Sequence, residues 1–173
     1  MIPLFKVVID DNVVNELQKV MRSGYIGQGV KVEEFEKKLY PLLGSQVLTL
    51  NSGTSALHLA LHLVGIKYGD NVISTPMTCT ATNMPILAAQ AKIVWADIDP
   101  NTGNIDIDSI RKMIKKNTDT CLDGYSVWEV TSIKAIMCVH WGGYPCNLEE
   151  LSDIEKEYGI PVIQDAAHAL GAT

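Results

Sequence analysis

The sequence predicts an α/β protein built on a mostly parallel sheet with helices on both faces. From residue 45 onward, short apolar segments of strand length alternate with segments whose apolar residues recur at helical spacing. The short segments are apolar almost throughout, as strands covered on both faces are. Hydrophobic residues make up 47% of the 173 residues and charged residues 20%, so the chain can bury a core.

The beginning of the chain is expected to be helical. Apolar residues at positions 13–21 recur at helical spacing, and candidate capping residues precede them at positions 10–12. Three glycines within residues 23–29 predict a loop, because glycine favours backbone angles that other residues avoid. A second helix is expected over residues 32–43, with Gly44 ending it.

The remaining elements follow in a regular order. Strands are expected at residues 47–50, 72–74, 92–95, 135–139 and 161–163. Helices are expected at residues 55–64, 79–89, 107–114 and 148–158. Residues 117–132 interrupt this alternation, and we expect them to form an inserted hairpin or a surface loop.

Charge and composition argue against several classes of partner. The net charge is −6 and no long block of like charges occurs, which speaks against nucleic acid and anionic membranes. No stretch is apolar and long enough to span a bilayer, and the N-terminal residues resemble neither a signal peptide nor a transit peptide. The four cysteines show no CxxC pair and no metal-ligand spacing, so we expect reduced thiols in a cytoplasmic protein without a metal.

The first candidate site is the segment from Asn51 to Leu57. A strand is expected to end there, Gly53 permits a tight turn, and a helix begins with unpaired N–H groups. Such a helix start attracts phosphate, and the hydroxyls of Thr54 and Ser55 can add hydrogen bonds. Ordinary N-capping by serine and threonine explains the same residues without a ligand, so both interpretations stay open.

The second candidate site surrounds Asp165 and His168. Asp165 follows a predicted strand at the carboxyl edge of the sheet, where open α/β sheets bind their ligands. A carboxylate there can pair with a protonated ring nitrogen, and His168 shares its face if the chain turns helical. Taken separately, a helix cap for Asp165 and a partly buried histidine with a backbone partner for His168 are the simpler interpretations.

Three further signals are weaker. Gly27-Gln28-Gly29 follows no predicted strand, so we reject it as a dinucleotide loop. His58 and His62 are four residues apart, but Leu59 replaces the glutamate of an HExxH zinc site, which favours core or interface histidines. His140 follows a strand end and either lines the same pocket as Asp165 or belongs to an ordinary loop.

Together these segments resemble the DegT/DnrJ/EryC1/StrS family of sugar aminotransferases, which are fold-type I enzymes that depend on pyridoxal phosphate. The resemblance runs over nearly the whole chain, and it rests on the number, order and spacing of the matching segments. These segments are residues 2–4, 23–29, 32–36, 51–57, 75–76, 81–83, 97–100, 139–143 and 165–169.

The resemblance implies roles for the candidate residues. Gly53, Thr54 and Ser55 match the turn that holds the cofactor phosphate. Asp165 matches the aspartate that keeps the pyridine nitrogen protonated, which makes the ring an electron sink. His168 matches the residue that contacts the ring hydroxyl.

Other positions concern the ring face and the subunit interface. Relatives usually place an aromatic residue where this chain has Cys79, so stacking on the cofactor ring is expected to be less extensive here. Active sites of the family lie at a dimer interface, which implies a homodimer. Tyr25, Ile26, Gly27 and His140 are the residues expected to meet the substrate or that interface.

The resemblance also implies that the catalytic centre is incomplete. In the family, the Schiff-base lysine lies beyond the segment that matches Asp165 and His168, and no lysine of this chain matches it. We therefore expect no catalytic residue in this chain, and no transamination by it alone. Residues 1–30 are expected to form an N-terminal helix and loop, and residues 31–173 part of the cofactor-binding large domain. The C-terminal small domain is expected to be absent.

For the whole protein the resemblance implies transfer of an amino group, commonly from glutamate, to a keto sugar carried on a nucleoside diphosphate. One alternative is a non-catalytic α/β module that binds phosphate or a sugar nucleotide, although the chain has no GxGxxG fingerprint. Another is a truncated fragment that acts in assembly.

Overall fold

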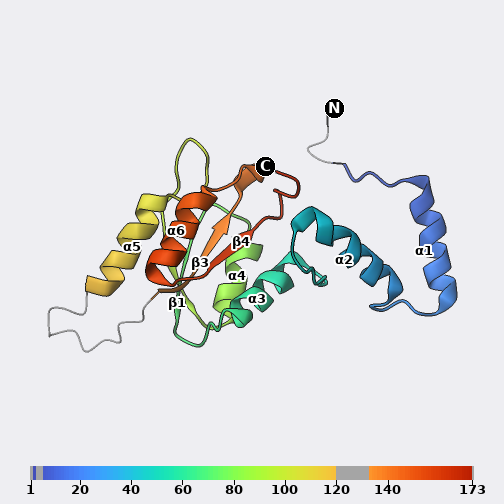
Figure 1. The fold of residues 1–173 in the computed structure, drawn as a ribbon, viewed down its shortest axis with the longest axis horizontal. Coiled ribbons are helices and arrows are strands. Elements are labelled where there is room, and N and C mark those ends of the chain that lie inside the picture. The colour runs from blue at the N-terminus through green and yellow to red at the C-terminus, as the bar shows by residue number, and fades with distance from the viewer. Residues whose placement is uncertain (1, 3–5, 120–132, 173) are drawn as a thin grey trace. The chain divides into compact units, whose positions relative to one another are not determined.

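The computed structural model describes residues 2, 6–119 and 133–172 (Figure 1). The insertion predicted at residues 117–132 lies outside this part of the chain, except for three residues that continue a helix. The chain divides into two compact units, residues 1–49 and 50–173.

The first unit contains two helices, as the sequence predicts. Helix α1 spans Asp11–Ser23, and the side chain of Asp10 accepts a hydrogen bond from a backbone N–H of its first turn. It ends at Gly24, whose φ of 72° requires the left-handed conformation that glycine adopts without strain. Helix α2 spans Val30–Leu43 and ends at Gly44 in the same way.

The prediction of a strand at residues 47–50 is wrong. Residues 46–50 form no strand with any described part of the chain. The backbone N–H of Thr49 instead donates to Oε1 of Glu36 over 2.8 Å, and the Thr49 hydroxyl donates to the same oxygen over 2.7 Å. The carboxylate of Glu36 on α2 therefore accepts the hydrogen bond that a carbonyl of a neighbouring strand would otherwise accept.

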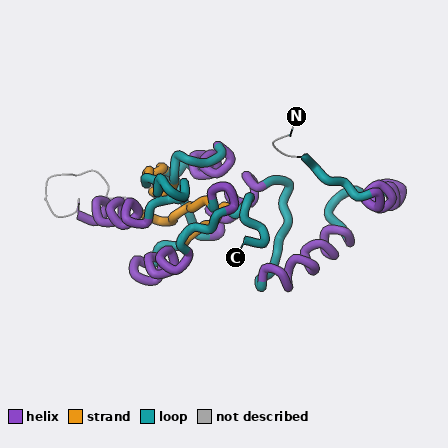
Figure 2. Tube along the Cα trace, turned by 90° about the horizontal axis from the view of Figure 1, so that it is seen from above, coloured by secondary structure: helices purple, strands orange, loops and turns teal. Residues whose placement is uncertain are grey.

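The second unit is built on a parallel sheet with the strand order β2-β1-β3-β4. The other predicted strands are confirmed, with small shifts at their ends. They are β1 (Asn71–Ser74), β2 (Lys92–Trp95), β3 (Ile133–Val139) and β4 (Val162–Asp165). Figure 2 shows these strands as short orange segments enclosed by helices.

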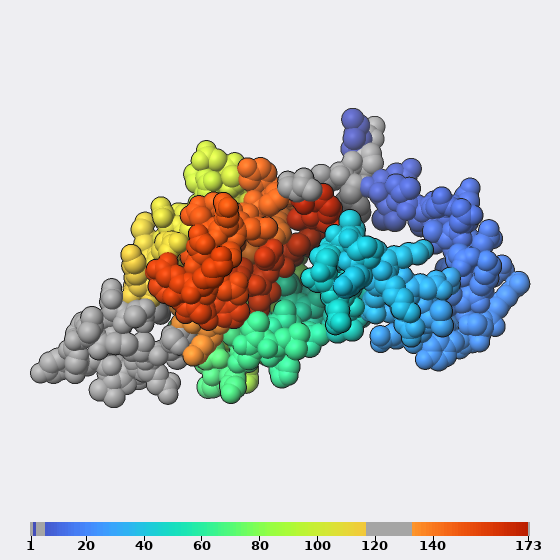
Figure 3. Space-filling view, viewed as in Figure 1, coloured from blue at the N-terminus to red at the C-terminus, as the bar shows by residue number. Residues whose placement is uncertain are grey.

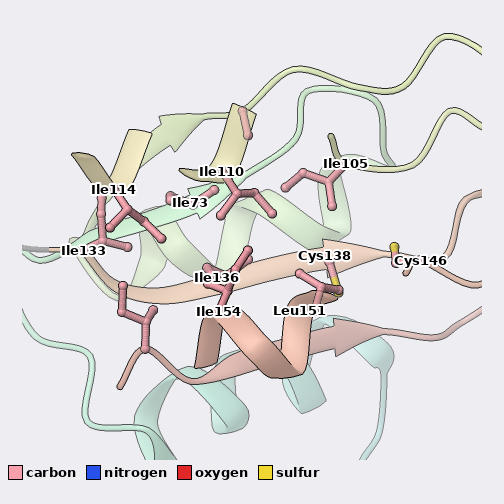
Figure 4. Packing of buried hydrophobic residues seen from close by; sticks show 12 residues of the cluster. Ile73, Ile105, Ile110, Ile114, Ile133, Ile136, Cys138, Cys146, Leu151 and Ile154 are labelled. Atoms are coloured by element: carbon pink, nitrogen blue, oxygen red, sulfur yellow. The ribbon is translucent and has the colours of Figure 1, made fainter. Parts of the chain in front are cut away.

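Four helices cover the two faces of this sheet. They are α3 (Gly53–Leu63), α4 (Thr80–Ala88), α5 (Ile107–Asp119) and α6 (Leu148–Tyr158). Figure 3 shows α5 and α6 side by side on the visible face of the unit. In Figure 4 the side chains of both helices point toward the sheet, Ile110 and Ile154 among them. The fold class is therefore confirmed.

Alternation along the strands decides which side chain reaches which face. On β3, Ile136 and Cys138 belong to the core beneath α5 and α6, whereas Met137 belongs to the core beneath α3 and α4. On β4, Ile163 lies in the α3/α4 core. The side chain of Asp165 therefore points to the α3/α4 face and that of Gln164 to the α5/α6 face.

Two smaller expectations can be compared with the structure. His58 and His62 are both exposed on α3, so the core half of their interpretation is wrong, whereas an interface role stays a prediction. Within the described residues, no helix combines the length and apolarity that crossing a bilayer requires.

Candidate functional site

A cavity of about 320 Å³ opens at the carboxyl ends of β3 and β4. This is the edge at which open parallel sheets bind ligands, and the volume lies within the range of about 300–1,000 Å³ that small-molecule sites occupy. The residues that line it are Thr78, Cys79, Val139, His140, Trp141, Asp165, Ala167 and His168. Four of the predicted site residues are thereby brought together: Cys79, His140, Asp165 and His168.

The carboxylate of Asp165 is fixed from two directions. Its Oδ2 accepts a hydrogen bond of 2.6 Å from the hydroxyl of Thr82, a buried residue of α4. Its Oδ1 accepts one of 3.2 Å from the backbone N–H of Ala167. Because an ionised carboxylate has about four acceptor positions, two donors leave it able to accept from a group in the cavity.

The hydroxyls of Thr78 and Thr82 form a directed chain toward this carboxylate. Their oxygens are 2.7 Å apart. Since ionised Asp165 can only accept, the proton of Thr82 is committed to it, and Thr78 must donate to Thr82. The hydroxyl of Thr78 therefore supports the carboxylate indirectly, through Thr82.

Cys79 and His168 are two exposed residues of the cavity wall. Cys79 precedes α4 as its N-cap residue and is exposed, without a side-chain capping hydrogen bond. His168 lies in a turn closed by a hydrogen bond of 2.9 Å from Ala169 N to Ala166 O, not in a helix. Its exposure shows that its interpretation as a partly buried histidine is wrong.

The turn that carries His168 packs closely against Gly143. Residues Trp141–Gly143 form a 3₁₀ turn, η1, directly after His140. A Cβ atom at Gly143 would lie 2.6 Å from the backbone oxygen of His168, and Gly143 also has a φ of +88°. Glycine is therefore required on both counts, steric and conformational.

Asn104 holds the wall of the cavity from a distant loop. Its Nδ2 donates to the backbone oxygens of Tyr144 and Pro145 over 3.0 and 3.1 Å. Its Oδ1 accepts from the backbone N–H of Trp141 over 2.8 Å. Asn104 is only 5% exposed, and the indole of Trp141 packs against the Cα of neighbouring Gly103. Asn104 thus joins its own loop to η1 and to the two residues that follow η1.

The predicted phosphate turn does not line the cavity. Gly53, Thr54 and Ser55 begin α3, and Ser52 caps the helix by accepting a hydrogen bond of 3.1 Å from Ser55 N. Capping by a serine of this segment is therefore confirmed, and Ser52 is the residue that supplies the cap. Phosphate binding here stays a prediction.

The predicted loop residues Tyr25, Ile26 and Gly27 belong to the first unit and are exposed. The apolar side chains of Tyr25 and Ile26 are 67% and 78% exposed. Their contact with a substrate or a second subunit stays a prediction.

The cysteines behind the cavity are thiols. Cys79, Cys138 and Cys146 form no disulfide, as the sequence predicts for them, and Cys121 lies outside the described residues. A hydrogen bond with Cys146, together with burial, raises the pKa of the Cys138 thiol well above its ordinary value. Cys146 donates from its sulfur to the backbone oxygen of Val139 over 3.1 Å. Both sulfur atoms are buried in the core beneath α5 and α6.

The sequence pattern alone predicts no role for Thr78, Thr82 and Asn104. The two threonines are four residues apart, a spacing that places hydroxyls near one another at the start of a helix and provides a usable signal. Asn104 gave no such signal, because its partners are 37 to 41 residues away.

A parallel sheet with a fixed carboxylate in a cavity at its carboxyl edge defines an α/β ligand-binding domain of the kind found in cofactor-dependent enzymes. The family model for the DegT/DnrJ/EryC1/StrS aminotransferase family matches residues 7–173. The chain therefore belongs to this family of enzymes, and the resemblance noted in the sequence is confirmed.

Two curated relatives are sugar-nucleotide aminotransferases by name. The chain is 39% identical over 165 residues to the UDP-4-amino-4,6-dideoxy-N-acetyl-β-L-altrosamine transaminase of Campylobacter jejuni strain 81-176, covering 95% of this chain and 40% of that protein. It is 34% identical over 171 residues to the UDP-4-amino-4-deoxy-L-arabinose–oxoglutarate aminotransferase of Shewanella sediminis, covering 98% of this chain and 40% of that protein.

Among solved structures, Spr1654 from Streptococcus pneumoniae in its pyridoxal phosphate form superposes with a TM-score of 0.83 at 28% identity, covering 98% of this chain and 44% of that one. The same protein has also been solved in its pyridoxamine phosphate form. The cofactor that the resemblance implied is thus the one found in this structural relative. The chain spans about two fifths of the length of these relatives.

Proposed function

We propose that this chain supplies the pyridine-binding half of the pyridoxal phosphate site of a sugar aminotransferase. The observation that carries the proposal is the Asp165 carboxylate, which faces the cavity while Thr82 and the Ala167 N–H hold it in place. The bound cofactor supplies an electron sink for amino transfer, and that sink requires a protonated ring nitrogen. Asp165 would hold the proton on that nitrogen.

The residues of the cavity fit such a ring. The carboxylate keeps free acceptor positions, and a charged N–H···O pair in a cavity partly shielded from water is stronger than one in bulk water. The apolar part of the wall comes from Cys79, Val139, Trp141 and Ala167. His168, in the turn after β4, is the group we assign to the ring hydroxyl, as the family resemblance implies.

The remaining parts of the cofactor would be bound elsewhere on the chain. We assign the phosphate to the beginning of α3, where Gly53, Thr54 and Ser55 present backbone N–H groups and hydroxyls. This assignment is supported by the family resemblance and by the packing of α3 against α4, whose N-cap residue Cys79 lines the cavity.

The reactants proposed for the whole protein are a nucleotide-linked keto sugar and an amino donor such as glutamate. The names of the two curated relatives support both reactants. We also propose a homodimer in which the loop of Tyr25, Ile26 and Gly27 contributes to the interface or the substrate site. No lysine of residues 1–173 matches the covalent lysine of the family, so this chain alone is expected to bind the cofactor without a covalent bond.

A titration of the purified chain with pyridoxal phosphate, read by absorbance, tests the proposal. Asp165→Asn keeps the shape of the side chain but removes its charge, so we expect the Kd to rise about 10- to 100-fold, the effect of losing a hydrogen bond to a charged group. Asp153→Asn is the matched control, because it removes a carboxylate from the exposed face of α6.

Borohydride reduction and intact mass then report covalent attachment. A stoichiometric adduct on one lysine would contradict the expected non-covalent complex. Equal affinities of the wild type and the folded Asp165→Asn variant would contradict the role of Asp165. Saturable binding of phosphate or a sugar nucleotide without binding of pyridoxal phosphate would favour the non-catalytic binding module instead.

A further inference from the structure

His140 lines the cavity, but its ring is engaged on both sides by the protein. It follows β3 directly and is only 4% exposed. Its Nδ1 accepts a hydrogen bond of 3.0 Å from the backbone N–H of Cys146, and its Nε2 lies 3.1 Å from Oε1 of Gln164. Neither nitrogen is left to bind a ligand in the plane of the ring.

These partners determine which nitrogen carries the proton. A backbone N–H can only donate, so Nδ1 must accept and is unprotonated. The proton of the neutral ring is therefore on Nε2, which donates to the amide oxygen of Gln164. A proton on Nδ1 would face the N–H of Cys146 and break the contact between β3 and the loop before α6.

The position of His140 relative to Asp165 shows how it can act on the site. The backbone N–H of His140 donates to the backbone oxygen of Asp165 over 3.1 Å, the last hydrogen bond between the ends of β3 and β4. Its ring holds the side chain of Gln164, which points to the opposite face of the sheet from Asp165. His140 thus holds the end of β4 from behind the carboxylate and does not touch the carboxylate itself.

We propose that His140 is a positioning residue of the cofactor site, present as the Nε2–H tautomer, which fixes the end of β4 so that Asp165 meets the pyridine nitrogen. This inference rests on the proposed function, because it assumes that Asp165 binds that nitrogen. His140 makes hydrogen bonds with Cys146, Gln164 and Asp165. These bonds join three segments of the second unit at one edge of the sheet.

The tautomer can be measured without any cofactor. Nitrogen-15 NMR of the histidine rings distinguishes the two neutral tautomers and the cation, and loss of one signal set in His140→Asn assigns the residue among the four histidines of the chain. We expect a protonated Nε2 and an unprotonated Nδ1 at neutral pH. A proton on Nδ1, or on both nitrogens, would overturn the inference.

The positioning role is tested with two ligands. One is pyridoxal phosphate and the other is its analogue with carbon in place of the ring nitrogen, which cannot pair with Asp165. The wild type should prefer pyridoxal phosphate about 10- to 100-fold, as expected for a hydrogen bond to a charged group. In His140→Ala this preference should fall about tenfold while the affinity for the analogue stays nearly constant.

Conservative variants separate positioning from a general loss of structure. His140→Asn retains an acceptor for Cys146 N, and His140→Gln retains a donor for Gln164, so each should restore part of the preference. Gln164→Ala removes only the partner of Nε2 from an exposed position, so it tests the same contact if the His140→Ala protein fails to fold. His62→Ala, on the exposed side of α3, is the matched control.

The outcomes distinguish a failure of the proposed role of Asp165 from a failure of the positioning role of His140. If the wild type binds both ligands equally, or binds neither, the proposed role of Asp165 fails and the inference falls with it. If the wild type shows the preference and His140→Ala and Gln164→Ala keep it unchanged, only the positioning role of His140 is overturned. A preference that falls in these variants and is partly restored by asparagine or glutamine supports it.

Discussion

The start of α3 and the end of β4 are both junctions between a loop and a regular element, yet they are stabilised in different ways. At α3 the cap is local, because Ser52 accepts from a backbone N–H three residues away. At β4 the carboxylate of Asp165 accepts from Thr82, which is 83 residues away in the sequence. A local cap stabilises a helix wherever it is placed, whereas a distant buried donor fixes a functional group only once the fold has formed.

The largest effect is expected for the most extensive of the distant contacts. Asn104→Ala removes three hydrogen bonds between a buried amide and the backbone of residues 141–145. We expect the free energy of unfolding to fall by about 3 kcal/mol, at about 1 kcal/mol for each bond. Denaturant unfolding measures it. Asn101→Ala is the control, because Asn101 is exposed and bonds only within its own turn; equal losses in the two variants would refute the role of Asn104.

The next effect concerns the carboxylate itself. Thr82→Val preserves shape and burial but removes the donor to Asp165, so the Kd for pyridoxal phosphate should rise about tenfold, equal to about 1.4 kcal/mol. Thr80→Val makes the same change at an exposed position of α4 and should leave the Kd unchanged. An unchanged Kd in a folded Thr82→Val protein would mean that the hydrogen bond does not orient Asp165 for the ligand.

A local effect should be smaller and confined to stability. Ser52→Ala removes the N-cap of α3 and should reduce the free energy of unfolding by about 1 kcal/mol. Ser52→Asn should restore most of it, because asparagine is an equally good cap. Thermal unfolding of the three proteins gives the comparison. A full loss in both variants would show that the serine hydroxyl does more than cap the helix.

The smallest effect is expected for a distant contact at the surface. Arg111 and Glu157 form an ion pair of 2.7 Å between α5 and α6, with the glutamate about half exposed. The hydrogen bond from Arg111 lowers the pKa of Glu157 from its ordinary value of 4.5. Stabilisation from this pair is therefore fully present above pH 4.5 and is lost as the pH falls through the lower pKa of the folded state.

Denaturant unfolding between about pH 5 and pH 3 measures this dependence. Glu157→Gln should reduce the dependence of the free energy of unfolding on pH in that range. The reduction should be small, because water and salt screen exposed ion pairs. If the variant steepened the curve, the sign assigned to the pKa shift would be wrong.

The sequence predicted most of the fold because the signals for it are local. The apolar strands after residue 70, the helical periodicity and Gly44 as a helix end depend on signals within a few residues, and each was found close to where it was expected. The strand at residues 47–50 failed for the opposite reason. Its pattern was apolar enough, but a strand needs a partner, and Thr49 donates to the Glu36 side chain instead.

The candidate site was predicted only in part, for the same reason. Asp165 and His168 could be placed at the edge of the sheet from the strand before them, and the cavity brings them together with Cys79 and His140. The spacing of Thr78 and Thr82 indicates only that their hydroxyls lie near one another. The bond from Thr82 to Asp165 and those of Asn104 could not be predicted, because they join residues that become neighbours only after folding. The contact of Gly143 with the His168 turn likewise appears only in three dimensions.

The strand order has one more consequence, for the dynamics of the site. Within the described residues β4 pairs with β3 on one side only, so it is an edge strand. We expect amides of β4 that face β3 to exchange slowly with solvent hydrogen, whereas alternate amides face away and have no partner strand within the described residues. Within the described residues, Asp165 therefore lies on one of the two edge strands of the sheet, β2 being the other, and Thr82 of α4 and the backbone N–H of Ala167 hold its carboxylate in place.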